Sequence, residues 1–429
     1  MTFPRLDWVS FRAPPQPVTS GMDLDDRYPA LSDLARKAKS RLPRFVWEYL
    51  DSATGNERAN HANTEALDAV ALCPGILAPV PADLSCRLMG AAWSMPVGIA
   101  PVGMSGLIWP GAEVTLARAA QDAGIPYSLS TVAAATPEEV GPATGGRGWY
   151  QLYPPRDAGI RRDMLARARD AGFDTLVLTA DVGTPSRRER QRRARLTNPM
   201  RLTPRIAAQA ALAPAWSLAT LRAGIPRLKT LDRYARPDEP GGTTGHIGYR
   251  LRTAPDWDYL RALRDEWDGP LVVKGVLDPG DAARLADIVD AIWVSNHGGR
   301  QFEAAPPALH VLPAIRVAVG PDVPLIADGG VRSGTDVLRY IAMGADMVML
   351  GRAFHHGLAA LGRPGVDHAV HILRAGLEAD MGQLGLSVPP GVRDRRCLAS
   401  APALPFFCTC TTRPCRNDRL QEDPHRQPR

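Results

Sequence analysis

The sequence lacks the features that mark secreted, membrane-spanning or zinc-binding proteins. No run of about 18 apolar residues could cross a bilayer, and the N-terminus has no basic-then-apolar stretch of the kind found in signal peptides. Only six of the 429 residues are cysteine, and none of them forms the paired C-x-x-C spacing of a zinc site. We therefore expect a cytoplasmic protein, peripheral at most to the inner face of a membrane, with no structural disulfide and no metal.

Positive charge is in excess, but it is not arranged for nucleic acid. The formal net charge is +6, and part of it lies in the run Arg187–Arg195, which lacks the interleaved aromatic side chains of a nucleic-acid surface. Hydrophobic residues make up 45% of the chain and charged residues 22%, which allows a sizeable core. This composition favours an anionic small molecule or an anionic membrane surface, and we expect no nucleic-acid partner.

Short apolar runs alternate with helix-like stretches through most of the chain. This alternation predicts an α/β fold of the (β/α)8 or TIM-barrel type. A doubly wound open sheet is the competing fold, but the first β–α turn has no G-x-G-x-x-G motif. The expected strands are Val97–Pro101, Pro126–Ser130, Trp149–Tyr153, Thr175–Ala180, Leu271–Gly275, Ala291–Ser295, Val323–Ala327 and Met347–Leu350.

The barrel pattern has an extension at each end and one long insertion. Helices broken at Pro43 are expected within Ala30–Leu50, and a further helix within Glu57–Val70. The expected divisions are a loose lead-in at 1–27, a barrel domain at 28–390, a long insertion after the fourth strand at 183–255, and an atypical tail without order at 391–429.

The insertion contains an apolar segment, Ile206–Thr220, which is flanked by Arg201, Arg205, Arg222 and Arg227. One interpretation is a helix packed against the barrel. The other is an amphipathic segment that lies on an anionic membrane. The sequence leaves both open.

Polar residues follow nearly every expected strand, and barrel active sites lie at this end of the strands. Glycines at Gly329-Gly330 and Gly351, with Arg332 and Arg352 nearby, suit a bound phosphate. The sequence therefore predicts a phosphorylated ligand at the seventh and eighth strands.

Other strand ends suit a polar heterocycle. Ser130, Gln151 and Thr179 can hydrogen-bond such a ring, and Lys274 could stabilise a negative charge on it. Flavin mononucleotide (FMN) meets these demands because it has one phosphate, a hydrogen-bonding pyrimidine edge and a ring that becomes anionic when reduced.

The stretch Ala291–Gln301 reads A-I-W-V-S-N-H-G-G-R-Q, a buried strand that leads directly into an imidazole and a guanidinium. His297 would act as the base that accepts a proton from a hydroxyl-bearing carbon centre, and Asp181 would fix its tautomer and stabilise its charged form. Arg188 and Arg300 would hold a carboxylate.

Two tyrosines complete the candidate site. Tyr49 and Tyr153 can hydrogen-bond the oxygen or the carboxylate of the substrate. For Tyr49 the sequence alone favours a core aromatic side chain.

Five motifs occur in a consistent order between roughly residues 28 and 390. They are L-P-R-F-V-W-E-Y-L-D-S-A (Leu42–Ala53), M-P-V-G-I-A-P-V-G (Met95–Gly103), Q-L-Y (Gln151–Tyr153), S-N-H-G-G-R-Q (Ser295–Gln301) and D-G-G-V-R-S-G (Asp328–Gly334). Together they strongly resemble the FMN-dependent 2-hydroxy-acid dehydrogenase and oxidase family, which includes L-lactate dehydrogenases, glycolate oxidases and mandelate dehydrogenases. The resemblance implies FMN at the barrel's C-terminal face, oxidation of an L-2-hydroxy acid to the 2-keto acid, and a homo-oligomer, with a tetramer favoured.

The resemblance also assigns roles to individual residues. It implies His297 as general base, Arg188 and Arg300 as carboxylate clamps, and Tyr49 and Tyr153 as substrate hydrogen-bonding groups. The FMN contacts that it implies are Pro101, Val102, Gly103, Ser130, Gln151, Thr179, Lys274, Ser295, Asp328, Gly329, Gly330, Val331, Arg332, Gly351 and Arg352.

Some features favour one branch of this family. Gly103 and Val132 stand where the glycolate oxidases resembled here carry larger residues, so the pocket should admit a larger substrate. The runs Pro101–Gly111 and Trp267–Pro279 resemble the bacterial lactate and mandelate dehydrogenases, which pass electrons to a membrane quinone or cytochrome-type acceptor. We therefore expect a dehydrogenase. The alternatives are an oxygen-using oxidase that produces hydrogen peroxide, a Schiff-base aldolase acting through Lys274, and an inactive flavin-binding relic.

Overall fold

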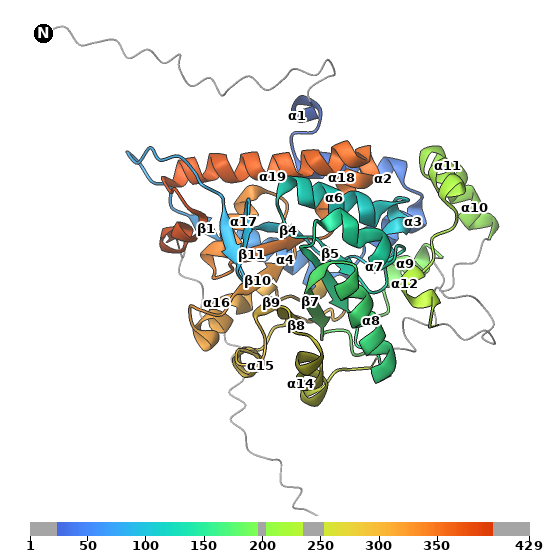
Figure 1. The fold of residues 1–429 in the computed structure, drawn as a ribbon. Coiled ribbons are helices and arrows are strands. Elements are labelled where there is room, and N and C mark those ends of the chain that lie inside the picture. The colour runs from blue at the N-terminus through green and yellow to red at the C-terminus, as the bar shows by residue number, and fades with distance from the viewer. Residues whose placement is uncertain (1–23, 196–202, 235–252, 398–429) are drawn as a thin grey trace, which may run out of the picture. The chain divides into compact units, whose positions relative to one another are not determined.

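A closed barrel of eight parallel strands forms the centre of the computed structural model, which describes residues 24–195, 203–234 and 253–397 (Figure 1). Neighbouring strands pair in the order β4-β11-β10-β9-β8-β7-β6-β5, and a parallel bridge between Ile99 and Tyr127 closes the circle. The predicted (β/α)8 barrel is therefore confirmed. The strands are β4 (Val97–Ile99), β5 (Ser128–Ser130), β6 (Gly148–Leu152), β7 (Phe173–Thr179), β8 (Leu271–Val276), β9 (Ala291–Val294), β10 (Leu325–Asp328) and β11 (Met347–Leu350).

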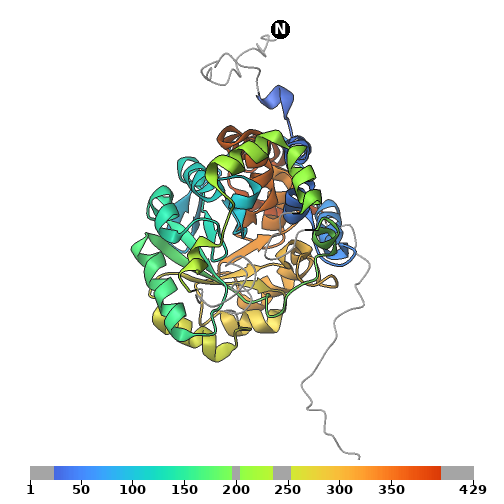
Figure 2. The same cartoon turned by 90° about the vertical axis from the view of Figure 1, so that its right-hand side faces the viewer.

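Helices surround this ring of strands, as the second view shows (Figure 2). The strands are buried on both faces, because side chains fill the barrel and helices cover its outside. The helices between and after the strands are α5 (Ser105–Ile108), α6 (Ala112–Ala123), α7 (Pro137–Val140), α8 (Ala158–Asp170), α14 (Trp257–Glu266), α15 (Pro279–Leu285), α16 (Ala308–Val319), α17 (Gly334–Ala342), α18 (Arg352–Leu361) and α19 (Arg363–Leu384).

The N-terminal helices reach the carboxyl end of the barrel. As expected, the chain breaks at Pro43 between α2 (Leu31–Arg41) and α3 (Arg44–Asp51), because proline cannot continue the hydrogen bonding of the preceding helix. The C-terminal end of α3 carries Tyr49 to the mouth of the barrel. Two further helices are α1 (Leu24–Arg27) and α4 (Arg58–Asp68).

A hairpin of β2 (Cys86–Leu88) and β3 (Ala91–Trp93) precedes the first barrel strand. Its Leu88 and Trp93 belong to the cluster of buried side chains inside the barrel, which also includes Trp149 and Trp293. The hairpin thus covers the amino end of the barrel and leaves the carboxyl end for a site.

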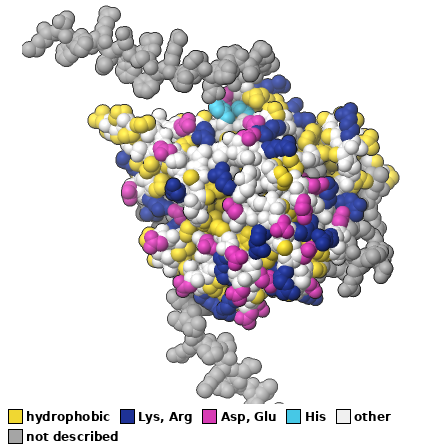
Figure 3. All heavy atoms as spheres, in the orientation of Figure 1, with side chains coloured by type: hydrophobic (Ala, Val, Ile, Leu, Met, Phe, Trp, Pro, Cys, Tyr) yellow, Lys and Arg dark blue, Asp and Glu magenta, His cyan; other side chains and the backbone are white. Residues whose placement is uncertain are grey.

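The insertion after β7 contains α9 (Glu189–Arg193), α10 (Pro204–Ala211), α11 (Pro214–Ala223) and α12 (Lys229–Asp232). Helices α10 and α11 form a hairpin on the outside of the barrel (Figure 1). Within the described ranges, no helix is both long and apolar enough to cross a membrane. On the face drawn in Figure 3, basic and acidic side chains are interspersed.

The chain divides into one unit that ends at Cys397 and a second unit at 398–429, which lies outside the described residues, as does most of the expected lead-in. The expected tail without order begins too early, because residues 391–397 belong to the 3-10 helix η3 (Pro389–Arg395) and to β12 (Arg396–Cys397). Strand β12 pairs with β1 (Ala71–Leu72), and Val392 is fully buried.

The expectation of no disulfide is wrong at Cys73, which is disulfide-bonded, whereas Cys86 is a free thiol. The fold brings β12 and Arg395 beside Cys73, whose N–H donates to the carbonyl of Arg395 at 2.7 Å. Spacing along the chain could not indicate this approach, because the segments lie far apart in the sequence.

Candidate active site

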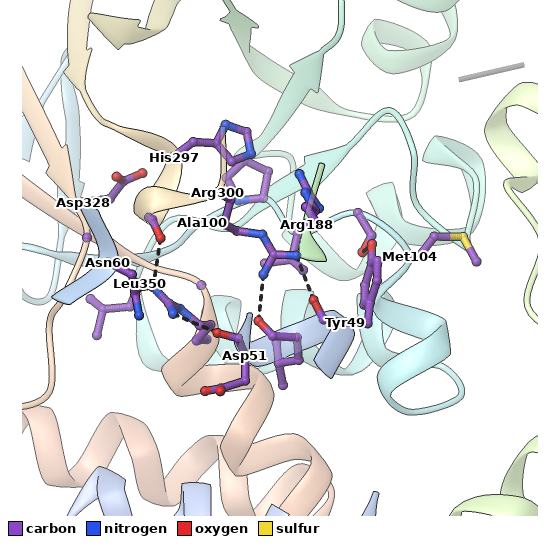
Figure 4. A pocket seen from close by; sticks show the side chains of 18 of the residues that line it. Tyr49, Asp51, Asn60, Ala100, Met104, Arg188, His297, Arg300, Asp328 and Leu350 are labelled. Atoms are coloured by element: carbon purple, nitrogen blue, oxygen red, sulfur yellow. Dashed lines mark hydrogen bonds between the residues drawn. The ribbon is translucent and has the colours of Figure 1, made fainter. Parts of the chain in front are cut away.

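A cavity of about 1290 Å³ opens at the carboxyl ends of the barrel strands. Its wall is built from strand ends, the N-terminal helices and the start of the insertion (Figure 4). The predicted site residues that line it are Tyr49, Pro101, Val102, Gly103, Tyr153, Arg188, Lys274, His297, Arg300, Asp328, Gly329, Gly330, Val331, Arg332, Gly351 and Arg352. The other five, Ser130, Gln151, Thr179, Asp181 and Ser295, lie outside the lining; of these, Asp181 contacts His297 and Ser295 contacts Lys274.

His297 stands at the turn that follows β9, in a left-handed conformation with φ 58°. Its Nδ1 lies 3.1 Å from Oδ1 and 3.2 Å from Oδ2 of Asp181, the residue two positions after β7. Gly299 allows this turn to approach α4, since a Cβ there would lie 2.5 Å from the backbone nitrogen of Asn60. Because Asp181 occupies Nδ1, Nε2 is the ring nitrogen left for a ligand.

The electrostatics of this pair suit a base. Burial lowers the pKa of His297 below its usual value, although the charge of Asp181 acts in the opposite direction. Burial acts to raise the pKa of Asp181, but the neighbouring His297 and Lys274 outweigh it, and this pKa ends below its usual range. At neutral pH the imidazole is therefore neutral and can accept a proton, and the carboxylate is charged and can stabilise the resulting imidazolium.

Two guanidinium groups share the same cavity (Figure 4). Arg300 donates from both terminal nitrogens to the carbonyls of Leu50 and Tyr49, at 2.8 and 2.7 Å. Arg188 donates to the hydroxyl of Ser186 at 3.0 Å and to the side-chain oxygen of Gln301 at 3.1 Å. All of these acceptors are formally neutral oxygens, so the charges of both arginines remain available to an anion.

The buried guanidinium of Arg300 stays protonated at neutral pH. Burial first, and then the charge of Arg188, lower the pKa of Arg300 to about 9. Like charges held together in a cavity favour binding of an anionic group that neutralises both, and a carboxylate matches the geometry of a guanidinium fork.

The two predicted tyrosines both reach the cavity. Tyr49 donates its hydroxyl to the carbonyl of Gly103 at 2.7 Å, and its ring lies 5.9 Å from the guanidinium carbon of Arg300. Tyr153 follows β6, and its N–H donates to the hydroxyl of Thr131 at 3.1 Å. The structure therefore places Tyr49 at the cavity wall instead of wholly within the core.

Unpaired polar atoms beside the cavity fit the flavin expected from the sequence. Within the described residues, Nε2 of Gln151 and Oγ1 of Thr179 are buried without a hydrogen-bond partner. They belong to adjacent strands, β6 and β7, and Thr179 pairs in register with Lys274 of β8. Buried polar groups are normally paired, so these atoms indicate a polar ligand such as a pyrimidine edge.

The backbone at the ends of β10 and β11 can approach a phosphate closely. Gly329 and Gly330 have φ of 105° and 76°, and a Cβ on Gly330 would lie 2.9 Å from the carbonyl oxygen of Asn63. Arg352 is held by Oδ1 of Asn60 at 2.6 Å, whereas Arg332 is bound to the carboxylates of Asp68 and Asp336. Arg352 is thus the arginine whose charge is less compensated by its protein neighbours.

Some residues of the site were not predicted. Asp51, Asn60 and Met104 line the cavity, and Asp51 and Asn60 accept hydrogen bonds from Arg352. Asp51 lies within the motif Leu42–Ala53 and Met104 within the run Pro101–Gly111, so these motifs could have indicated both residues, whereas Asn60 lies outside them in a stretch that indicates only a helix.

Comparisons with known proteins agree with this geometry. The model of a family described as FMN-dependent dehydrogenase matches residues 38–396. An L-lactate dehydrogenase of Caulobacter vibrioides (strain NA1000 / CB15N) is 39% identical over 359 residues, which cover 83% of this chain and 94% of the relative. An L-lactate dehydrogenase of Pseudomonas aeruginosa (strain LESB58) is 38% identical over 358 residues, which cover 82% of this chain and 93% of the relative.

Solved structures give the same result. The crystal structure of the monotopic membrane protein (S)-mandelate dehydrogenase superposes with a TM-score of 0.80 and 33% identity, over 86% of this chain and 98% of that one. A mandelate oxidase with benzoyl-formic acid superposes with a TM-score of 0.72 and 32% identity, over the same fractions. The family match at residues 38–396 includes all eight barrel strands.

Proposed function

The chain belongs to the FMN-dependent dehydrogenase family and uses FMN to oxidise a 2-hydroxy acid, and we propose which substrate it takes, which acceptor receives the electrons and what its site residues do. The substrate is an L-2-hydroxy acid of the lactate or mandelate type, and the electrons pass to a membrane acceptor, a quinone or a cytochrome-type protein. One observation carries the proposal. A neutral imidazole backed by Asp181 shares a cavity with two arginines whose acceptors are all neutral.

Different residues of the cavity bind the substrate and accept its proton. Arg188 and Arg300 bind the substrate carboxylate, and the hydroxyls of Tyr49 and Tyr153 orient the substrate. Nε2 of His297 accepts the proton that leaves the hydroxyl-bearing centre. Bound FMN supplies the acceptor for the electron pair.

Other residues of the chain hold the cofactor. Gln151, Thr179 and Lys274 bind the polar edge of its ring, and the backbone of Asp328–Arg332 with Gly351-Arg352 binds its phosphate. Lys274 places a positive charge where negative charge develops, which favours electron uptake.

The size of the cavity, about 1290 Å³, supports a substrate with a side chain larger than a methyl group. Gly103 lies close against Val132, since a Cβ on Gly103 would lie 2.6 Å from Cγ2 of Val132 and 3.6 Å from the hydroxyl of Tyr49. A side chain at position 103 would therefore force Val132 to move, and the wall here depends on glycine.

An anaerobic titration tests the proposed substrate and acceptor. The purified yellow protein is mixed with glycolate, L-lactate or L-mandelate, and flavin absorbance is followed before and after oxygen is admitted. We expect bleaching by lactate or mandelate and slow reoxidation by oxygen compared with a quinone analogue or an artificial dye. Rapid reoxidation with release of hydrogen peroxide would identify the oxidase alternative, and a flavin that no hydroxy acid bleaches would identify the inactive relic.

The His297–Asp181 pair predicts the direction of a pH effect. Because the base must be neutral, kcat/KM should rise with pH through the pKa of His297, which lies below its usual value. Asp181→Asn removes a charge that raises this pKa, so the acidic limb should move to lower pH. The rate on the plateau should fall about 10- to 100-fold, because the imidazolium loses its stabilising carboxylate.

Asp265→Asn is the matched control, since Asp265 is an exposed carboxylate on α14. Its pH profile should coincide with that of the unmodified enzyme. An acidic limb that stays in place or moves to higher pH in Asp181→Asn would contradict the assigned coupling.

We further propose that the α10–α11 hairpin holds the protein on an anionic membrane surface. One face of the hairpin packs on the barrel through Ile206 and Trp216, and the indole of Trp216 donates to the carbonyl of Leu107 at 3.0 Å. The opposite face presents Leu212 and Leu221, which are 85% and 80% exposed. The exposed arginines Arg205, Arg222 and Arg227 accompany these leucines, which matches the pattern of an interfacial helix.

The double variant Leu212→Asp/Leu221→Asp should release the protein from the membrane. We expect its affinity for vesicles containing phosphatidylserine to fall at least about tenfold in a sedimentation assay, because burial of each leucine contributes about 1.5–3 kcal/mol. Dye-linked activity in solution should not change. Val317→Asp is the control, because Val317 is 84% exposed on α16, away from the hairpin. An equal loss of vesicle affinity in the double variant and in Val317→Asp would contradict the proposal. Absence of vesicle binding by the unmodified protein would also contradict it.

We also propose that the protein assembles into a homo-oligomer. The family resemblance favours a tetramer.

A further inference from the structure

A hydrogen-bonded group of four side chains connects the cavity wall to the interior of the barrel. Nζ of Lys274 lies 3.0 Å from Oδ2 of Asp328 and 2.6 Å from Oγ of Ser295. Oγ of Ser295 donates to Oδ1 of Asp328 at 2.7 Å. On the side of the barrel interior, Nε1 of Trp293 donates to Oδ2 of Asp328 at 3.0 Å. All four residues are buried, with at most 8% of their surface exposed.

Two donors therefore share one oxygen of Asp328. The ammonium of Lys274 and the indole N–H of Trp293 both bind Oδ2, and the hydroxyl of Ser295 binds Oδ1. In a buried site, each donor to a carboxylate withdraws part of its negative charge from the others. The indole N–H thus reduces the share of the Asp328 charge that compensates Lys274.

The indole also contacts the lysine directly. Nζ of Lys274 lies 5.1 Å from the centroid of the Trp293 ring, within the range of a cation–π interaction. Trp293 therefore fixes both members of the ion pair, one through its N–H and the other through its ring. Lys274 and Asp328 face the cavity, whereas Trp293 lies entirely inside the barrel.

We propose that Trp293 is a positioning residue that raises the reduction potential of bound FMN by acting through Asp328 on the charge of Lys274. Reduced flavin carries more negative charge than oxidised flavin, so a less compensated lysine beside the ring favours reduction. The inference rests on the proposed function, because it requires the ring to lie beside Lys274. Loss of the indole N–H would bind Lys274 more tightly to Asp328 and lower the potential.

Trp149 provides a matched control within the same cluster. It is buried to the same degree as Trp293, and the two rings meet edge to face with centroids 6.3 Å apart. In the described structure Trp149 fills the interior without donating to Asp328. A purely structural role for Trp293 would therefore give both tryptophans the same effects.

The experiment is a redox titration of the purified, FMN-loaded protein, with thermal unfolding measured in parallel. Trp293→Phe, and Trp293→Met as a second variant of different shape, should each shift the equilibrium toward oxidised flavin by about tenfold, or about 30 mV for a two-electron couple. Trp149→Phe should lower the thermal midpoint to a similar extent but leave the potential unchanged. Equal potentials in the unmodified protein and both Trp293 variants, or an equal shift in Trp149→Phe, would overturn the inference.

Lys274→Met separates this inference from the proposed function. A lower potential in Lys274→Met, with no shift in the Trp293 variants, would reject the role of Trp293 and keep the flavin beside Lys274. No shift in Lys274→Met would reject the proposed position of the ring, and with it the route by which Trp293 acts.

Discussion

His297→Gln is expected to retain bound FMN and to lose turnover by about 10²- to 10⁴-fold, the range that general acid–base catalysis contributes. Glutamine can still donate a hydrogen bond to Asp181, but its amide cannot accept a proton at neutral pH. We expect a loss of kcat with an unchanged flavin spectrum, because the proposed role of the imidazole is toward the substrate and not in holding the cofactor phosphate. Stopped-flow reduction of the flavin by L-lactate or L-mandelate measures the step directly.

The conformation of His297 requires a second variant. Its φ of 58° is a left-handed conformation that asparagine tolerates better than glutamine. His297→Asn should therefore be as inactive as His297→Gln but closer to the unmodified enzyme in thermal stability. Flavin reduction within a few-fold of the unmodified rate in either variant would remove His297 from the role of base.

Arg300→Lys is expected to raise the KM for the hydroxy acid about 10- to 100-fold, which corresponds to a charge-assisted hydrogen bond of about 1.5–3 kcal/mol. A lysine retains the charge but presents a point donor in place of a planar fork. It also cannot bind the carbonyls of Tyr49 and Leu50 together, so the end of α3 should loosen. Steady-state kinetics and thermal unfolding measure the two effects separately.

Arg188→Lys provides the comparison, because Arg188 contacts Ser186 and Gln301 and does not hold α3. It should raise KM with a smaller loss of thermal stability than Arg300→Lys. If KM stays unchanged in Arg300→Lys while thermal stability falls, Arg300 serves only to fasten α3, and the carboxylate binds elsewhere.

Local patterns account for the agreement between the predicted and observed barrel. Short apolar runs such as Ala291–Val294 become strands buried on both faces, and each is followed by the residues that a strand end presents. Since all strands of a barrel point the same way, residues after different strands must meet at one face. The convergence of His297, Asp181 and Lys274 was therefore predictable without any knowledge of long-range contacts.

Other features depend on contacts between distant segments. The sequence left two interpretations for Ile206–Thr220, and the structure gives α10 and α11 one face on the barrel and another with exposed leucines. Strand β12 returns from the C-terminal part of the chain to pair with β1, next to the disulfide-bonded Cys73. No local pattern reports such approaches, because they depend on how elements pack and not on the period of their side chains.

The chain alone determined the barrel, its broken N-terminal helices and the kind of chemistry at its strand ends, because periodicity and strand direction are properties of short segments. Tertiary structure alone decided how strongly each charge acts. It leaves Arg188 and Arg300 with neutral partners, gives Arg332 two carboxylates, and places Trp293 beneath Asp328. Burial and the identity of neighbours set the strength of a charge, and both exist only once remote parts of the chain have packed together.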